Sequence, residues 1–146
     1  MTENIVFRSP VSESDLEKYY ELRWRILRKP WDQPKGSEKV DTDDKSFHIM
    51  AELDGKVIGV GCIHELEDGV GRIRFMGVDD EFQNHGIGKE IVRLLEDYAL
   101  EKRWKMIWLY AREIAWDFYV NLGYKIIGDG ELLFGVIKHK IMEKEL

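Results

Sequence analysis

The chain has 146 residues, of which 22 are Lys or Arg and 28 are Asp or Glu, so its formal net charge is −6. The length and a hydrophobic fraction of 44% suit one globular domain over residues 1–146 and exclude a disordered chain. The acidic balance disfavours a general nucleic-acid binder or a protein of anionic membrane surfaces, so we expect neither nucleic acid nor membrane as a partner. No stretch approaches the roughly 20 apolar residues of a membrane-spanning helix. The N-terminus lacks the basic and apolar regions of a signal peptide, so we expect a cytoplasmic protein.

The N-terminal third predicts one strand and one helix. The apolar run at residues 5–7 indicates a short strand, and apolar residues at helical spacing predict an amphipathic helix over residues 14–28. Ser14 and Glu17 have the spacing of a capping box at its start. Pro30 ends the helix, because the residue before a proline is pushed out of the helical region. The Pro-, Gly- and charge-rich stretch after it, up to residue 45, predicts a loop or a broken short helix.

Three strands follow, at residues 47–53, 57–66 and 70–78. The pair Asp54-Gly55 separates the first two and is a strong hairpin signal, and Asp68-Gly69 separates the second and third in the same way. This segment therefore predicts an antiparallel meander.

The second half alternates helices and strands. A helix is predicted from Ile87 to Tyr98, then a strand at 106–110, then a helical stretch that ends near Leu122. Two last strands, at 124–127 and 132–141, are expected to form a closing hairpin. The fold class is α/β with a central mixed sheet flanked by helices.

The most informative segment runs from Phe75 to Lys89, where a strand, a short loop with two glycines and a long helix follow one another. Glycines allow the backbone to approach a ligand closely, and a helix N-terminus offers unpaired N–H groups that favour a phosphate. The segment is not a Walker A loop, because Gln83 and Glu90 stand where that motif needs Gly and Ser or Thr. It also lacks the third glycine of a Rossmann fingerprint, since Ile91 stands there. Taken alone, the glycines are equally consistent with a helix start that only needs a turn.

Two motifs together resemble the GNAT superfamily of N-acetyltransferases. Gln83-Asn-His-Gly86-Ile-Gly88 is similar to the Gln/Arg-x-x-Gly-x-Gly/Ala pyrophosphate loop of that family. The segment from Ala115 through Phe118-Tyr119 to Gly123-Tyr124 resembles its second signature. The resemblance extends over about residues 46–127, and it implies a GNAT-like fold that uses acetyl-CoA as cosubstrate.

The resemblance places acetyl-CoA in a cleft where the fourth and fifth strands splay apart. It implies a bulge at Met76-Gly77-Val78, which the glycine within a strand also indicates. The N–H of Val78 would then donate to the thioester carbonyl, where negative charge grows during attack. The pyrophosphate would be held by backbone N–H groups, with Gln83 shaping the loop and Lys89 adding charge. These N–H groups belong to Asn84, His85, Gly86, Ile87, Gly88 and Lys89.

Tyr119 matches the family tyrosine that protonates the departing CoA thiolate, a role suited to a phenol that is protonated at pH 7. The alternative is a packed aromatic residue on a helix that also carries Phe118. Phe118 belongs to the same cofactor motif. Arg112 departs from the family pattern, which often has Asn there, and its guanidinium would instead reach a phosphate or a carboxylate.

The general base is predicted to be Glu65, near the end of its strand, where a carboxylate would relay a proton through water. An exposed strand-end charge is the alternative. Cys62 and His64 share one strand face, but the other histidines show no ligand spacing, so we expect no metal site. We expect Cys62 to be a buried, unreactive thiol.

For the acceptor, Trp24 and Trp31 are candidates by resemblance, although both also suit a role as core or loop anchors. Arg72 and Arg74 share one strand face, and Arg74 would bind a substrate carboxylate if that face borders the cleft; otherwise the face is solvated. The predicted activity is acetyl transfer to a primary amine of a small molecule or peptide by direct attack. The alternatives are a non-catalytic acyl-CoA-binding or regulatory domain and a chain whose glycines are only structural. A homodimer is also possible.

Overall fold

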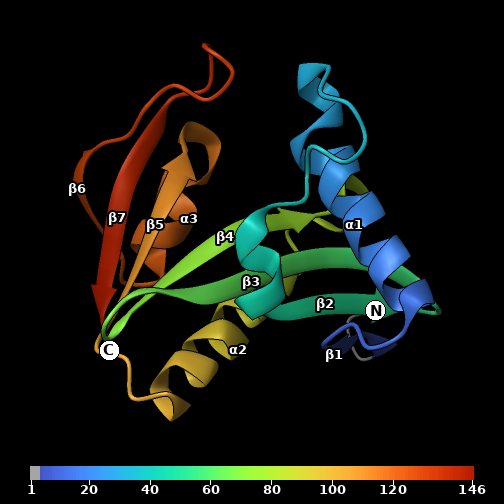
Figure 1. Ribbon diagram of the computed structural model, residues 1–146, viewed down its shortest axis with the longest axis horizontal. Helices are drawn as coiled ribbons and strands as arrows, with labels where there is room; N and C mark the ends of the chain where they lie inside the picture. Colours follow the sequence, from blue (N-terminus) through green and yellow to red (C-terminus); the bar gives the residue numbers. More distant parts are fainter. Residues whose placement is uncertain (1–3) are drawn as a thin grey trace.

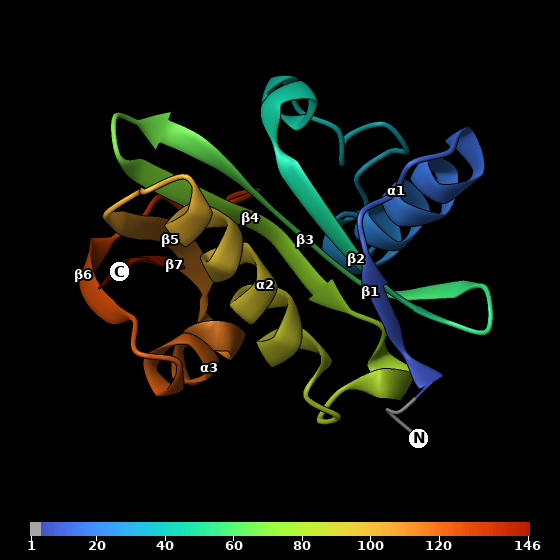
Figure 2. The ribbon, with the colours of Figure 1, turned by 90° about the horizontal axis from the view of Figure 1, so that it is seen from below.

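A computed structural model describes residues 4–146. Seven strands form a single sheet in the order β1-β2-β3-β4-β5-β7-β6, and helices pack on both of its faces (Figures 1 and 2). The strands are β1 (Val6–Arg8), β2 (Phe47–Leu53), β3 (Lys56–Glu67), β4 (Val70–Val78), β5 (Met106–Arg112), β6 (Lys125–Asp129) and β7 (His139–Glu145). The α-helices are α1 (Glu13–Leu27), α2 (Ile87–Glu101) and α3 (Trp116–Asn121). The mixed sheet with flanking helices confirms the predicted fold class.

Helix α1 begins one residue earlier than predicted, and its capping box is a different one. Ser12 accepts from the backbone N–H of Asp15 (3.0 Å), and the Asp15 carboxylate accepts from the N–H of Ser12 (3.3 Å). The prediction of a Ser14–Glu17 box was therefore wrong. Arg8 pairs with the same carboxylate (2.7 Å), which ties β1 to the start of the helix. After α1 the chain forms only short 3₁₀ helices before β2, as the broken-helix interpretation predicted.

The meander β2-β3-β4 is antiparallel and turns at the two predicted hairpins. The bounds of β2 and β4 agree with the prediction, and β3 extends one residue further at each end. Gly55 and Gly69 have φ of 82° and 77°, the left-handed values that such tight turns need.

The core lies on both faces of the sheet. On one face α2 packs Ile91 and Leu95 against residues such as Ile63 and Ile107. On the other face α1 packs Tyr19 and other residues against β2 and β3. Figure 2 shows α2 and α3 in front of the sheet and α1 beyond it. None of the helices within residues 4–146 combines the length and apolar character that crossing a membrane requires.

Strands β4 and β5 pair in parallel over only three positions and then diverge. The pairs are Val70 with Met106, Gly71 with Ile107, and Arg72 with Trp108. Beyond them the two strands splay into the V seen in Figure 1. The C-terminal half of β4 and the end of β5 thus leave an open space between them, as the family resemblance predicted.

The last strand lies later in the chain than predicted. The apolar run from Leu132 to Ile137 is a connection closed by one isolated bridge between Leu133 and Ile137, and β7 begins only at His139. Phe134 (φ 53°) and Gly135 (φ 74°) adopt left-handed conformations that turn the chain back on itself. A continuous strand over 132–141 was therefore wrong, because this turn interrupts it.

Candidate functional site

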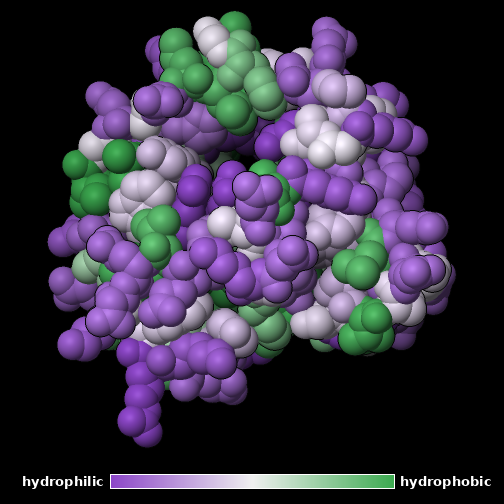
Figure 3. Space-filling model, viewed as in Figure 1, coloured by the Kyte–Doolittle hydropathy of each residue, from purple (hydrophilic) through white to green (hydrophobic). Residues whose placement is uncertain are grey.

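A cleft of about 910 Å³ occupies the space between the diverging strands. The end of α1, the loop before α2, α3 and the β6–β7 connection complete its walls. In the space-filling view, the apolar tip of that connection stands above a hollow with hydrophilic atoms around it (Figure 3). The predicted site residues that line the cleft are Arg74, Met76, Gly77, Val78, Gln83, Asn84, Gly86, Ile87, Gly88, Lys89, Arg112, Phe118 and Tyr119.

The β4 strand does contain a bulge, but two residues before the predicted glycine. Val60 pairs with Gly77 and Cys62 with Arg74, so two residues of β4, Phe75 and Met76, oppose one of β3. Phe75 has φ of 56°, which marks it as the irregular residue. Phe75, Met76 and Gly77 all line the cleft, so the bulge lies at its wall.

The residue opposite the bulge is glycine for a steric reason. A Cβ on Gly61 would lie 2.5 Å from the Sδ of Met76 and 2.7 Å from Ile91. Only a residue without a side chain allows the bulged strand and helix α2 to approach so closely.

The loop before α2 has the geometry of an anion site. Gly86 is the N-cap of α2 with φ of 79°, and no side chain of residues 4–146 caps the helix. The first N–H groups of the helix therefore point outward without intrahelical partners. The Gln83 amide donates to the carbonyl of Val78 (3.3 Å) and to the carboxylate of Asp80 (3.2 Å), so this side chain shapes the loop. His85 is exposed and does not line the cleft.

The two sequence motifs contact each other. A Cβ on Gly88 would lie 3.3 Å from Cζ of Phe118, so the aromatic ring of α3 covers the first turn of α2. The next residue, Tyr119, is 5% exposed and lines the cleft. Burial raises the pKa of Tyr119, and the positive charge of Arg112 opposes that rise. The phenol is therefore protonated at neutral pH and held next to a cation.

Besides His85, three predicted residues lie outside the cleft. Glu65 is exposed, and its carboxylate accepts from the backbone N–H of Gly69 (3.3 Å) in the β3–β4 turn. The Trp24 indole donates to the carbonyl of Gln33 (3.0 Å) and so anchors the loop after α1. Trp31, in that loop, is 36% exposed. The structure does not bring Glu65 to the cleft. Trp24 anchors the loop after α1, and Trp31 is a partly exposed residue of that loop.

The cleft also contains residues that sequence reasoning did not assign. Arg28 comes from the end of α1, Tyr110 from β5, and Glu131 and His139 from the two sides of the β6–β7 connection. Because residues 132–141 were predicted to be one continuous strand, the prediction missed the connection that brings Glu131 and His139 to the cleft. The predicted splay of β4 and β5 was a signal for Tyr110, because that residue lies on the diverging part of its strand.

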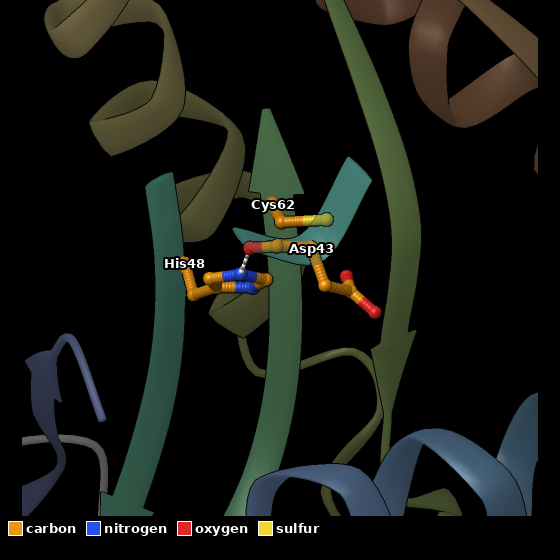
Figure 4. A group of neighbouring side chains, drawn as sticks. All are labelled: Asp43, His48 and Cys62. Atoms are coloured by element: carbon orange, nitrogen blue, oxygen red, sulfur yellow. Dashed lines mark hydrogen bonds between the residues drawn. The ribbon is translucent and has the colours of Figure 1, made fainter. Parts of the chain in front are cut away.

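Beside the cleft, Asp43, His48 and Cys62 lie close enough to suggest a metal site (Figure 4). Both ring nitrogens of His48 are already engaged, with the Tyr19 hydroxyl (2.7 Å) and the backbone carbonyl of Asp43 (2.8 Å). The carboxylate of Asp43 points away from His48 and pairs with Arg23 (3.0 Å). Burial raises the pKa of Cys62 to about 11, so its thiol is protonated. These three residues thus form a hydrogen-bonded core rather than an open ligand set.

Comparison with known proteins agrees with this geometry. Residues 16–124 match the model of the acetyltransferase (GNAT) family. An uncharacterized N-acetyltransferase of Bacillus subtilis, YitI, is 26% identical over 93% of this chain and 95% of its own. A putative N-acetyltransferase of Lactobacillus plantarum has the same fold, with a TM-score of 0.82 at 21% identity over 97% of each chain. A GNAT family acetyltransferase of Elizabethkingia anophelis, solved with acetyl-CoA bound, aligns with a TM-score of 0.77 at 16% identity over 99% of each chain. The sequence match, the splayed strands and the glycine loop agree, and the chain belongs to the GNAT family of acetyltransferases.

Proposed function

We propose that this protein is a single-domain enzyme that transfers the acetyl group of acetyl-CoA to a primary amine by direct attack. The observation that carries the proposal is one cleft that joins the uncapped N-terminus of α2, the bulged end of β4 and the buried Tyr119. The first of these suits the pyrophosphate, the second the thioester, and the third the leaving thiolate.

In the proposed reaction the lone pair of the neutral amine attacks the carbonyl carbon of the thioester. The C–N bond forms, and negative charge develops on the carbonyl oxygen, to which the N–H of Val78 donates. The C–S bond then breaks, the thiolate takes the proton of Tyr119, and the nitrogen loses a proton. Burial of Tyr119 keeps its proton in place until the thiolate forms. Glu131 or His139, whose side chains line the cleft, would accept the proton of the nitrogen, and transfer of a proton back to Tyr119 restores the phenol. Burial lowers the pKa of His139, which keeps its imidazole neutral at pH 7.

Calorimetric titration with acetyl-CoA, CoA and ATP tests the cofactor site first. We expect both CoA forms to bind and ATP not to compete with them. Release of CoA in the presence of amines then separates an enzyme from a non-catalytic acyl-CoA-binding domain, which would bind the cofactor without turnover.

Tyr119→Phe tests the acid. The variant keeps the ring and loses only the hydroxyl, so we expect kcat to fall by about 10²–10⁴-fold while the Kd for acetyl-CoA stays the same. Tyr98→Phe is the matched control, since Tyr98 stacks on Phe47 away from the cleft. Unchanged kcat in Tyr119→Phe would remove this tyrosine from the reaction.

A further inference from the structure

We propose that the acceptor amine carries a carboxylate, and that Arg72 and Arg74 bind this group on the α1 side of the cleft. This inference rests on the proposed acetyl transfer and names the class of its acceptor: small molecules in which an amine and a carboxylate lie close together, as in amino acids.

The charge of the cleft is opposite to that of the chain. The whole protein has a formal net charge of −6. Among the described residues, however, the cleft is lined by five cations and by Glu131 as its single carboxylate. The five cations are Arg28, Arg72, Arg74, Lys89 and Arg112. A cleft of this kind concentrates anions even though the molecule as a whole repels them.

Arg72 is a partly buried cation without a carboxylate partner among the described residues. Its guanidinium lies over the rings of Tyr110 (5.1 Å) and Trp108 (5.5 Å) on the neighbouring strand. Its Nε is buried and has no hydrogen-bond partner within residues 4–146. Burial and the nearby Arg74 lower its pKa to about 10. The aromatic rings hold the side chain in place, and its donors are free to bind an anion.

Arg74 lies two residues further along β4, on the same face, and points to the same side of the sheet. Its guanidinium carbon is 4.7 Å from the centre of the Phe75 ring, and that of Arg28 is 5.4 Å from the same ring. Neither arginine forms an ion pair with a carboxylate among the described residues. Besides Arg23, which pairs with Asp43, the ring of Phe75 thus contacts two cations without a carboxylate partner. A planar carboxylate suits the forked donors of Arg72 and Arg74.

These arginines are separate from the proposed phosphate site. The glycine loop leads into α2, which packs on one face of the sheet, whereas Arg28 ends α1 on the opposite face. Lys89 and the backbone N–H groups of α2 remain for the pyrophosphate. The arginines of β4 therefore lie on the face of the sheet opposite the one on which α2 packs, away from the proposed phosphate site.

The cluster also favours the chemistry of the amine. Positive charges close to an ammonium group lower its pKa, because they disfavour its charged form. An acceptor held by its carboxylate would therefore lose its ammonium proton more easily in this cleft than in water. The same cations repel a diamine, whose second ammonium group would lie among them.

The test compares amine acceptors that differ in one charge. CoA release is measured with each of the common amino acids, with the corresponding amino-acid amides, and with 1,4-diaminobutane. We expect at least one amino acid to show a kcat/KM about tenfold or more above that of its amide, and the diamine to be a poor substrate. The amide is a stringent comparison, because its amine is less basic than that of the amino acid. A larger fraction of the amide is therefore neutral and able to attack, which favours the amide unless the carboxylate is recognised. Equal rates for acid and amide, or a preference for the diamine, would overturn the inference and leave the acetyl transfer intact.

Three variants locate the effect. Arg72→Gln and Arg74→Gln should raise KM for the preferred amino acid about tenfold and reduce the acid-to-amide ratio toward one. Arg74→Lys keeps the charge and loses the fork, so we expect an intermediate effect. The Kd for acetyl-CoA should not change in any of them. Arg103→Gln is the control, since it removes the same charge from an exposed position outside the cleft.

A binding experiment decides the question even without turnover. The CoA-saturated protein is titrated with the amino acids and their amides. Binding of an amino acid that is lost in Arg72→Gln and absent for its amide supports the inference. No binding of any amino acid together with no turnover would overturn it. Failure of acetyl-CoA itself to bind is a different result, because it refutes the proposed function.

Discussion

The arginines on the α1 side of the sheet differ in whether the fold supplies a carboxylate partner for their guanidinium groups. Arg23, on α1, is completely buried, and its guanidinium donates to both carboxylate oxygens of Asp43 (3.0 Å each). It also donates to the carbonyl of Glu38 (3.0 Å) and the hydroxyl of Tyr19 (3.2 Å). Arg72 and Arg74 of β4 are only partly buried, yet they have no carboxylate partner among residues 4–146.

We infer from this difference two kinds of charge: a structural charge, which other groups of the fold neutralise, and a functional charge, which is left for a ligand to neutralise. A buried cation is tolerated when a carboxylate and other acceptors replace its water. Asp43, Glu38 and Tyr19 do so for the two terminal nitrogens of Arg23, although its Nε, like that of Arg72, has no partner among the described residues. A cation withdrawn from water without such a partner costs free energy, and the fold offsets that cost elsewhere. Such a group is expected where a ligand supplies the missing partner. Removing Arg23 should therefore affect folding, and removing the β4 arginines should affect acceptor binding.

The largest effect is expected for Arg23→Gln. This change leaves the carboxylate of Asp43, whose side chain is 8% exposed, without its cation. Breaking a buried pair in this way costs about 3–5 kcal/mol. Urea denaturation followed by circular dichroism measures the loss, with Arg103→Gln as a control that stays within about 0.5 kcal/mol of wild type. A loss below about 1 kcal/mol would show that the pair contributes little to stability and that Arg23 is not a structural charge.

A second prediction concerns His64, which pairs across the sheet with Arg72 and is 3% exposed. Burial, followed by the charges of Arg72, Arg74 and Lys45, lowers the pKa of His64 to about 4, and only Asp43 opposes this. Between pH 6.5 and 4 the unfolded chain therefore binds a proton that the folded chain does not. The contribution of His64 to stability is complete above pH 6.5 and falls by about 3 kcal/mol as the pH drops through this range.

The free energy of unfolding of wild type and His64→Gln, measured at several pH values, tests this. We expect the variant to show a smaller loss between pH 6.5 and 4, and Arg72→Gln to reduce the loss in part by removing a neighbouring cation. His85→Gln is the control, since His85 is exposed. Parallel pH profiles for wild type and His64→Gln would contradict the prediction.

Sequence reasoning succeeded where local rules decide the structure. The Asp-Gly turns set the meander, and periodicity with the glycine loop placed α2 and its N-terminus. It failed where tertiary contacts choose between local options. Ser14 was as good a capping residue as Ser12 on sequence grounds, and the Arg8–Asp15 pair from β1 decides in favour of Ser12.

The site shows the same division. The cleft-lining residues of the two motifs could be named from sequence, because their spacing carries the information, but His85, named with them, does not line the cleft. The bulge at Phe75 could not be placed, because a non-glycine residue adopts its positive φ and the glycine nearby indicated Gly77 instead. Glu65 was chosen for its position near a strand end, and only the strand pairing places it in the β3–β4 turn. Whether Arg74 faced solvent or the cleft depended on the splay of the strands and on α1.

The smallest effect concerns the stability of the double variant Arg72→Gln/Arg74→Gln. Burial lowers the pKa values of both arginines, and the charge of Arg74 adds to this at Arg72, as the charge of Arg23 does at Arg74. Their charged forms are therefore less favourable in the folded chain than in the unfolded one. Neutral side chains remove this penalty, while the lost cation–π contact of Arg72 with Tyr110 works in the opposite direction. We therefore expect the variant to be stabilised by about 1 kcal/mol or less at pH 7, as is common when charge is removed from a binding site. Urea denaturation beside Arg103→Gln measures the change. If the free energy of unfolding falls by more than about 1 kcal/mol, the β4 arginines are structural charges like Arg23. Removing a charged group lowers stability in this way only when the group forms stabilising contacts within the folded chain.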